Sequence, residues 1–186
     1  MKPNAKLYED TQEILIRHEE VLNAVRKLGE MITEDYRGKE PVLVCVLKGA
    51  CIFYADLLRE IDLHVTMDFV IASSYGSGTQ STGNVKIRKD LDFDIAGRDV
   101  IVVEDIVDSG ITLSFLKRVL QDRGAASIKI ATLLDKPARR RTDLKADYFC
   151  FTIPNEFVVG YGLDYNERYR NLPDICILKP EIYSGK

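Results

Sequence analysis

The sequence has no hydrophobic run long enough to cross a membrane, and its first residues resemble no secretory signal. A membrane-spanning helix needs roughly 18 or more apolar residues in a row, and no stretch of this chain approaches that length. The N-terminal Met-Lys-Pro-Asn-Ala-Lys lacks the apolar core of a signal peptide. These absences argue against a membrane protein and predict a cytoplasmic location.

Cysteine and histidine are scarce, and their spacing indicates neither a metal site nor a disulfide. The four cysteines are Cys45, Cys51, Cys150 and Cys176. They form no Cys-x-x-Cys pair, and three of them lie in apolar runs, so we expect buried, reduced thiols. The two histidines, His18 and His64, stand alone without a partner at ligand spacing, and we interpret both as structural.

The chain also lacks an excess of positive charge and a triphosphate-binding motif. Its 26 basic and 29 acidic residues give a net charge of −3, which provides no general attraction for nucleic acid. The three arginines 139–141 follow Pro137 and precede Asp143, so we interpret them as a solvated loop or a subunit contact. No Gly-x-x-x-x-Gly-Lys-Ser/Thr loop is present, which argues against an ATPase.

What the sequence does contain is an alternation of apolar strands and amphipathic helices. The 186 residues suffice for one α/β domain and are too few for two ordinary ones, so we expect 1–186 to be a single domain. Strands are predicted at 41–47, 65–72, 85–88, 100–103, 127–134, 148–153 and 175–178, and helices at 21–32, 50–58, 113–120 and, as one polar turn, 165–170. This order predicts a parallel core sheet with a small hood built from the chain ends.

Residues 98–112 combine a buried strand, a cluster of three acids at 104–108 and an anion-binding turn. The β-branched run 100–103 is typical of a strand covered on both faces, and we expect it to end at Glu104. Asp108-Ser-Gly-Ile-Thr112 then leads into a helix. The free backbone N–H groups of a helix start, together with two hydroxyls, suit a phosphate group.

The acids Glu104, Asp105 and Asp108 would repel a phosphate unless they bind something else. Carboxylates accept hydrogen bonds from sugar hydroxyls and hold Mg²⁺ directly or through water. A lone Asp-x-x-Ser is more often a helix cap with solvated charges. The ordered series of apolar run, two acids, a third acid, Ser, Gly and Thr makes that alternative the weaker one and indicates a sugar phosphate with metal.

This stretch, Val-Glu-Asp-Ile-Val-Asp-Ser-Gly-x-Thr, resembles the phosphoribosyl-pyrophosphate (PRPP) signature of the type I phosphoribosyltransferases, in particular of their hypoxanthine-guanine branch. The resemblance extends from about Leu43 to Ile177. It implies a central, mainly parallel sheet flanked by helices, with a hood and a flexible catalytic loop. It also implies transfer of the 5-phosphoribosyl group from PRPP to N9 of hypoxanthine or guanine in purine salvage, with Mg²⁺, by a homodimer or homotetramer.

The resemblance assigns roles to the residues of the signature. Glu104 and Asp105 are the acids linked to the ribose and the metal, and Ser109, Gly110 and Thr112 hold the 5′-phosphate. Asp108 is the general acid or base that handles the proton at purine N7. The family often has Lys where this chain has Ile111, so a side-chain contribution there is absent.

The remaining roles fall on motifs elsewhere in the chain. The resemblance implies pyrophosphate contacts for Lys48 and Gly49, after a cis bond preceding Lys48, and for Ser74, Tyr75 and Arg170. Asp164 is implied to bind a second Mg²⁺. The polar, Gly-rich segment 73–84 is expected to close over the substrates as a lid.

For the base, the resemblance implies that Lys136 donates to the exocyclic oxygen, Phe157 stacks on the ring, and the carbonyl of Val158 accepts from a 2-amino group. Each residue alone could be a solvated charge or part of the core. A rival hypothesis is a PRPP-binding regulatory protein with the same fold. Such regulators carry an added winged-helix domain or a basic RNA-binding face, for which this chain has neither room nor charge, and the chain keeps Asp108.

Overall fold

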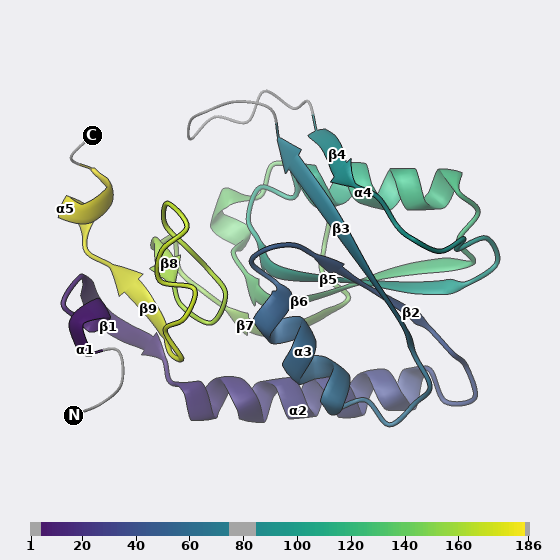
Figure 1. Cartoon of the computed structure of the whole chain (residues 1–186), viewed down its shortest axis with the longest axis horizontal. Coiled ribbons are helices and arrows are strands. Elements are labelled where there is room, and N and C mark those ends of the chain that lie inside the picture. The colour runs from purple at the N-terminus through teal and green to yellow at the C-terminus, as the bar shows by residue number, and fades with distance from the viewer. Residues whose placement is uncertain (1–4, 75–84, 185–186) are drawn as a thin grey trace.

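A six-stranded sheet forms the centre of the computed structural model, which describes residues 5–74 and 85–184 (Figure 1). The strand order is β4-β3-β2-β5-β6-β7. The strands are β2 (Val42–Val46), β3 (Thr66–Ser74), β4 (Val85–Lys89), β5 (Asp99–Val107), β6 (Ser127–Asp135) and β7 (Tyr148–Thr152). All neighbours pair in parallel except β3 and β4, which form an antiparallel edge. The predicted α/β fold with a mainly parallel sheet is confirmed.

Helices cover both faces of this sheet (Figure 1). They are α2 (His18–Asp35), α3 (Cys51–Arg59) and α4 (Ile111–Asp122). α2 and α3 bury Leu43 and Cys45 of β2, whereas α4 packs on the face that carries Val42 and Val44. Successive strand side chains point to opposite faces, so an uninterrupted apolar strand such as β2 is buried on both. Within the described ranges, no helix has the length and apolar character that crossing a membrane requires.

A second sheet, of order β1-β9-β8, forms the predicted hood beside the main sheet (Figure 1). Its elements come from both ends of the chain: α1 (Ala5–Tyr8), β1 (Thr11–Ile16), β8 (Val158–Val159), β9 (Ile175–Leu178) and α5 (Pro180–Tyr183). β1 and β9 are antiparallel, with Thr11 opposite Leu178 and Ile16 opposite Ile175. The hood therefore exists only when distant parts of the sequence come together.

The central strand β5 is longer than the sequence predicted. The strand does not end at Glu104 but continues through the acids to Val107. The reason is its neighbour β6, whose backbone pairs Leu134 with Ile106 and Asp135 with Val107. Ladder pairing thus holds the acidic residues in extended backbone, and their side chains occupy fixed positions at the end of the sheet.

The predicted helical turn at 165–170 is wrong. Tyr165 and Arg168 form an antiparallel bridge there, and Asn166 and Glu167 adopt left-handed φ angles of 51° and 63°. Asparagine tolerates this conformation better than most residues, and a local turn of this kind cannot continue a right-handed helix. The elements α1, β1 and α5 were not predicted from the sequence.

Candidate functional site

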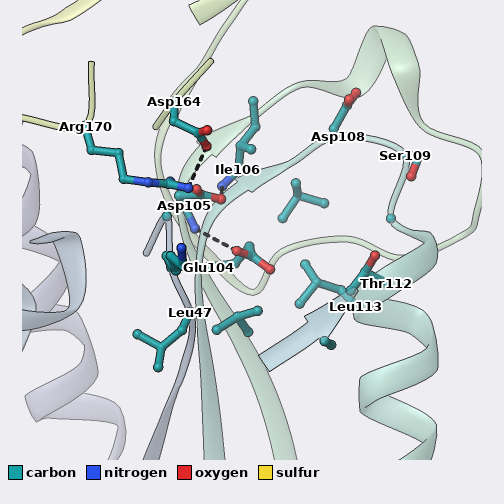
Figure 2. Close-up of a pocket in the computed structure, with 16 residues that line it drawn as sticks. Leu47, Glu104, Asp105, Ile106, Asp108, Ser109, Thr112, Leu113, Asp164 and Arg170 are labelled. Atoms are coloured by element: carbon teal, nitrogen blue, oxygen red, sulfur yellow. Dashed lines mark hydrogen bonds and ion pairs between the residues drawn. The ribbon is translucent and has the colours of Figure 1, made fainter. Parts of the chain in front are cut away.

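The carboxyl ends of β2 and β5 open onto a cavity of about 310 Å³, at the edge where parallel sheets bind ligands. Figure 2 shows Glu104 and Asp105 between Asp164 and Arg170 on one side and the turn that enters α4 on the other. We call this cavity the polar pocket. The predicted residues that line it are Lys48, Gly49, Glu104, Asp105, Asp108, Ser109, Gly110, Thr112, Asp164 and Arg170.

The turn before α4 has the geometry of an anion site. Gly110 caps the helix with φ of 79°, a left-handed conformation that costs glycine little. A Cβ on Gly110 would lie 2.4 Å from Oγ1 of Thr142, so a side chain would also clash. The backbone N–H of Ile111 donates to Oγ of Ser109 at a long 3.4 Å. First-turn N–H groups lack intrahelical acceptors, so they and the hydroxyl of Thr112 are suited to bind a phosphate.

Glu104 and Asp105 form a closely coupled acidic pair at the end of β5. The N–H of Asp105 donates to Oε1 of Glu104 at 3.2 Å, and the N–H of Ile106 donates to Oδ1 of Asp105 at 2.7 Å. Loss of water raises the pKa of Glu104 well above its usual value, and the charge of Asp105 raises it further. Loss of water also raises the pKa of Asp105, although its bonds to Glu104 and Ile106 oppose this. A bound cation, or a ligand with hydroxyl donors, would stabilise the charged forms of both acids and so lower both pKa values.

We expect Glu104→Gln to raise the melting temperature of the ligand-free protein by a few degrees at neutral pH. A carboxyl whose pKa is higher in the folded state stabilises the fold in acid, and this contribution is lost as pH rises through that pKa. Glutamine keeps the Oε1 acceptor without the charge. The gain should therefore be absent near pH 4 and largest near pH 8. Thermal unfolding with a metal chelator measures it, and a variant less stable than the parent at pH 8 contradicts it.

The acids of the polar pocket fit a magnesium ion that arrives with its substrate. Oδ1 of Asp164 lies 2.8 Å from Nη2 of Arg170, and Oδ2 accepts the N–H of Glu167 at 2.8 Å. Across residues 5–74 and 85–184, no three His, Cys, Asp or Glu side chains converge as a ready cage for a metal. Mg²⁺ usually keeps several waters and uses one or two carboxylates together with substrate phosphates. The donor set matches that mode of binding.

The loop after β2 brings a lysine and a glycine to the polar pocket. The peptide bond between Leu47 and Lys48 is cis, as the resemblance implied. Gly49 approaches Asp105 so closely that a Cβ would lie 1.6 Å from its Oδ2, so no other residue fits this position without displacement of the acid. Nζ of Lys48 lies 3.0 Å from Oε2 of Glu167, and both side chains are exposed. The lysine is therefore available to exchange this partner for an anion.

Arg170 lies at the same end of the polar pocket as Lys48. Its Nη1 donates to the carbonyl oxygen of Gly162 at 2.8 Å, and its Nη2 is ion-paired with Asp164. A Cβ on Gly162 would lie 2.1 Å from the carbonyl oxygen of Gly49, so the loops that carry Lys48 and Arg170 are in direct contact. Two cations from distant segments thus meet at one end of the polar pocket.

A second cavity adjoins the polar pocket and shares Asp105, Asp108 and Asp164 with it. We call it the base pocket, and the predicted residues that line it are Lys136, Phe157 and Val158. Lys136 is only 5% exposed, and its Nζ donates to the carbonyl oxygen of Glu156 at 2.6 Å. Burial lowers the pKa of this ammonium, and the charge of Asp108 acts in the opposite direction.

An aromatic group supports the base pocket from the hood. The ring of Phe157 stacks on Tyr183 of α5, with centroids 4.8 Å apart and planes at 21°, and it meets Tyr165 edge-on at 5.7 Å. Val158 is buried in β8 and pairs with Ile177 of β9. Phe157 lines the base pocket, whereas its stacking partner Tyr183 does not.

Asp108 lies where the two pockets meet. Its side chain is 38% exposed, and its Oδ1 is 3.4 Å from Nε of Arg139. Oδ1 itself is shielded from solvent and accepts no hydrogen bond from the residues described here. A carboxyl with an unsatisfied oxygen at the border between a sugar-side and a base-side cavity is well placed to exchange a proton with a bound base.

The sequence reasoning also missed contributors to the site. Arg139, Glu156 and Leu163 line the base pocket, and the sequence assigned no role to them. Ile106, which lies inside the signature, lines it as well and was also given no role. The interpretation of 139–141 as a solvated loop or a subunit contact is wrong for Arg140, whose side chain is 14% exposed because it is hydrogen-bonded inside the fold. In the predicted lid 73–84, Tyr75 lies outside the described residues, and Ser73 and Ser74 are described by their backbone alone.

Comparison with known proteins agrees with this geometry. Residues 11–166 match the family model for a phosphoribosyl transferase domain. A protein named hypoxanthine-guanine phosphoribosyltransferase from Streptococcus thermophilus is 54% identical over 178 residues, which cover 96% of this chain and 99% of the relative. One of the same name from Streptococcus pneumoniae is 54% identical over 179 residues, with 96% and 99% covered. A solved hypoxanthine phosphoribosyltransferase from Staphylococcus aureus is 48% identical, with a TM-score of 0.94 and coverage of 98% of this chain and 99% of that one.

Proposed function

This chain belongs to the phosphoribosyl transferase family, and on that premise we propose that it transfers the 5-phosphoribosyl group of PRPP to N9 of hypoxanthine or guanine. The bond between ribose C1 and the pyrophosphate oxygen breaks, the C1–N9 bond forms, and the base loses a proton. The products are IMP or GMP and pyrophosphate. The observation that best supports this reaction is the junction of the polar and base pockets at Asp105 and Asp108, which would place a sugar phosphate and a planar base end to end.

The sugar end of the substrate would occupy the turn before α4 and the acidic pair. Ser109, Gly110 and Thr112 would hold the 5′-phosphate through hydroxyls and first-turn N–H groups. Glu104 and Asp105 would accept hydrogen bonds from the ribose hydroxyls. Because positive charge develops on the ribose ring as the leaving group departs, fixed carboxylates beside it would stabilise the transition state more than the ground state.

The pyrophosphate would lie between Lys48 and Arg170, which enter the polar pocket from touching loops. Each now pairs with an acid, Lys48 with Glu167 and Arg170 with Asp164, so binding would exchange one anionic partner for another. Glu104, Asp105 and Asp164 would hold Mg²⁺ with the substrate. The ion supplies neutralisation of the charge that collects on the leaving group.

The base would be held by Lys136, Phe157 and Val158. The ammonium of Lys136 has three donors and no acceptor, so it would donate to a 6-oxo group while it keeps its bond to Glu156. Phe157 would stack on the ring, and the carbonyl of Val158 would accept from the 2-amino group of guanine. Asp108 would take the proton released by the base at N7.

The proposal extends to the organisation of the protein. Residues 1–186 would act as one domain, since the base pocket combines Lys136 after β6 with Val158 of the hood. A Mg²⁺ requirement, assembly as a homodimer or homotetramer, and a cytoplasmic location are part of the same proposal through the family resemblance. A PRPP-binding regulator is not favoured, because the curated relatives with near full-length matches are named as transferases.

Steady-state assays with purified protein test the proposal. With Mg²⁺ and PRPP, we expect hypoxanthine or guanine to yield nucleotide and an equal amount of pyrophosphate. Omission of Mg²⁺ should remove turnover. Binding of PRPP without turnover of any purine base would instead favour the regulator. A folded variant with Asp105→Asn should bind PRPP poorly. It therefore distinguishes damage to the binding site from loss of folded protein.

A further inference from the structure

The loop after β6 contacts the turn that carries Asp108. Its backbone is tied to that turn by two hydrogen bonds, from the N–H of Lys136 to the carbonyl oxygen of Val107 at 3.0 Å and from the N–H of Arg141 to that of Ser109 at 2.9 Å. These bonds leave the carbonyl of Asp108 between them. The residue that reaches this carbonyl is Arg140.

The guanidinium of Arg140 is engaged on every side. Nε donates to the carbonyl oxygen of Asp108 at 3.0 Å, and Nη2 donates to that of Val107 at 3.2 Å. Nη2 also pairs with the carboxylate of Asp135, and Nη1 donates to the carbonyl oxygen of Leu144. The side chains of Arg140 and Asp135 are 14% and 20% exposed. Such enclosure shields the bonds from competing water.

Three of the four acceptors of Arg140 belong to the two segments that the reaction must align. Val107 ends β5 and Asp108 begins the turn before α4, and Asp135 ends β6 next to Lys136. Among the described residues, Arg140 lines neither the polar pocket nor the base pocket, and it borders a separate cavity. It is therefore placed to act on the site through its neighbours and without contact to substrate.

We propose that Arg140 is a positioning residue, whose fork of hydrogen bonds fixes the backbone of Val107 and Asp108 and so aims the Asp108 carboxyl at the base. The inference rests on the proposed function. A guanidinium is needed because its planar donors reach several fixed acceptors at once, whereas an ammonium presents three donors from a single atom. A misplacement of about 1 Å at a reacting group is enough to cost roughly 10²-fold in rate.

The test is Arg140→Lys, with Arg141→Lys as the matched control. Lysine keeps a positive charge opposite Asp135, so the variant should fold, yet it loses the fork to Val107 and Asp108. We expect kcat with hypoxanthine to fall about 10²-fold, while the KM for PRPP rises much less. The side chain of Arg141 is exposed and only its backbone N–H contacts the turn, so the control should retain parental kinetics.

A double-mutant cycle separates positioning from general damage. If Arg140 acts through Asp108, adding Arg140→Lys to Asp108→Asn should lower kcat by less than about 3-fold further, because the carboxyl to be aimed is already gone. Multiplicative losses would overturn the inference, as would a single variant with kcat within about 2-fold of the parent. If Arg140→Lys fails to fold, the double variant Asp135→Asn/Arg140→Met takes its place. This variant leaves no unpaired charge, and the same limits on kcat apply to it. A parent without any turnover would refute the proposed function first, and the inference with it.

Discussion

Asp108→Asn is expected to lower kcat by about 10²–10⁴, the contribution that a positioned general acid or base makes, with little change in the affinity for PRPP. Asparagine has nearly the same shape but cannot take up a proton from the base. The carboxyl lies at the border of the polar and base pockets, with one oxygen shielded and unsatisfied. The backbone carbonyl of Asp108, which holds the turn through Arg140, is unchanged by the substitution.

The contrast with Thr112→Ala makes this result specific. Thr112 lines the polar pocket at the start of α4 and is assigned to the phosphate, so its loss should raise the KM for PRPP more than it lowers kcat. Both constants come from steady-state kinetics, and isothermal calorimetry with Mg²⁺-PRPP gives the affinity. An Asp108→Asn enzyme with near-parental kcat and a large rise in KM would make Asp108 a structural cap of the helix.

The second large effect concerns discrimination at position 6 of the purine. Lys136 presents only donors to the base pocket, and it is 5% exposed. A 6-amino group would place its hydrogens against the buried ammonium, so adenine should be nearly inert. Sites built on a required hydrogen bond reject the wrong group by about 10⁴–10⁵, and we expect kcat/KM for hypoxanthine to exceed that for adenine by a ratio of this order.

Lys136→Gln should reduce this ratio, because the amide offers an acceptor as well as a donor. We expect kcat/KM for hypoxanthine to fall and that for adenine to rise or hold. Arg139→Gln is the matched control: it removes the other cation of the base pocket, which is more exposed, and should leave the ratio near its parental value. Comparable turnover of adenine by the parent, or an unchanged ratio in Lys136→Gln, would remove Lys136 from the specificity assignment.

The central strands of the main sheet were predictable because each contains an apolar run, whereas the edge strand β4 alternates apolar and charged residues. β2 is buried along its whole length, and the sequence shows this directly. The end of β5 was not predictable, because Glu104 and Asp105 are poor strand residues that only pairing with β6 keeps extended. The hood strand β1 was missed for a similar reason: half of it is polar, and its partner β9 lies at the far end of the chain.

In the candidate site, too, some residues could be identified from the sequence and others could not. Glu104, Asp108 and their neighbours form a contiguous motif, so the sequence alone placed them. Arg140 binds mainly to backbone carbonyls, which every residue possesses, and no pattern in the sequence identifies such acceptors. Glu156 also acts through its backbone, because its carbonyl oxygen accepts a hydrogen bond from Lys136, and no sequence pattern identifies it. The motif therefore marks side chains that line the polar pocket, whereas the contacts that hold them in place are seen only in the structure.

The pairing of β1 with β9 also determines how late in synthesis a growing chain can complete its site. A nascent chain that has left the ribosome as far as β7 already contains all strands of the main sheet and the acids of β5. It still lacks Phe157, Val158 and Arg170, and β1 has no strand partner. Domains fold during synthesis as their segments emerge. The part of the site proposed to bind the purine is thus completed last. Until β9 emerges, the backbone N–H and C=O groups of residues 11–16 lack the strand partner that they have in the folded protein.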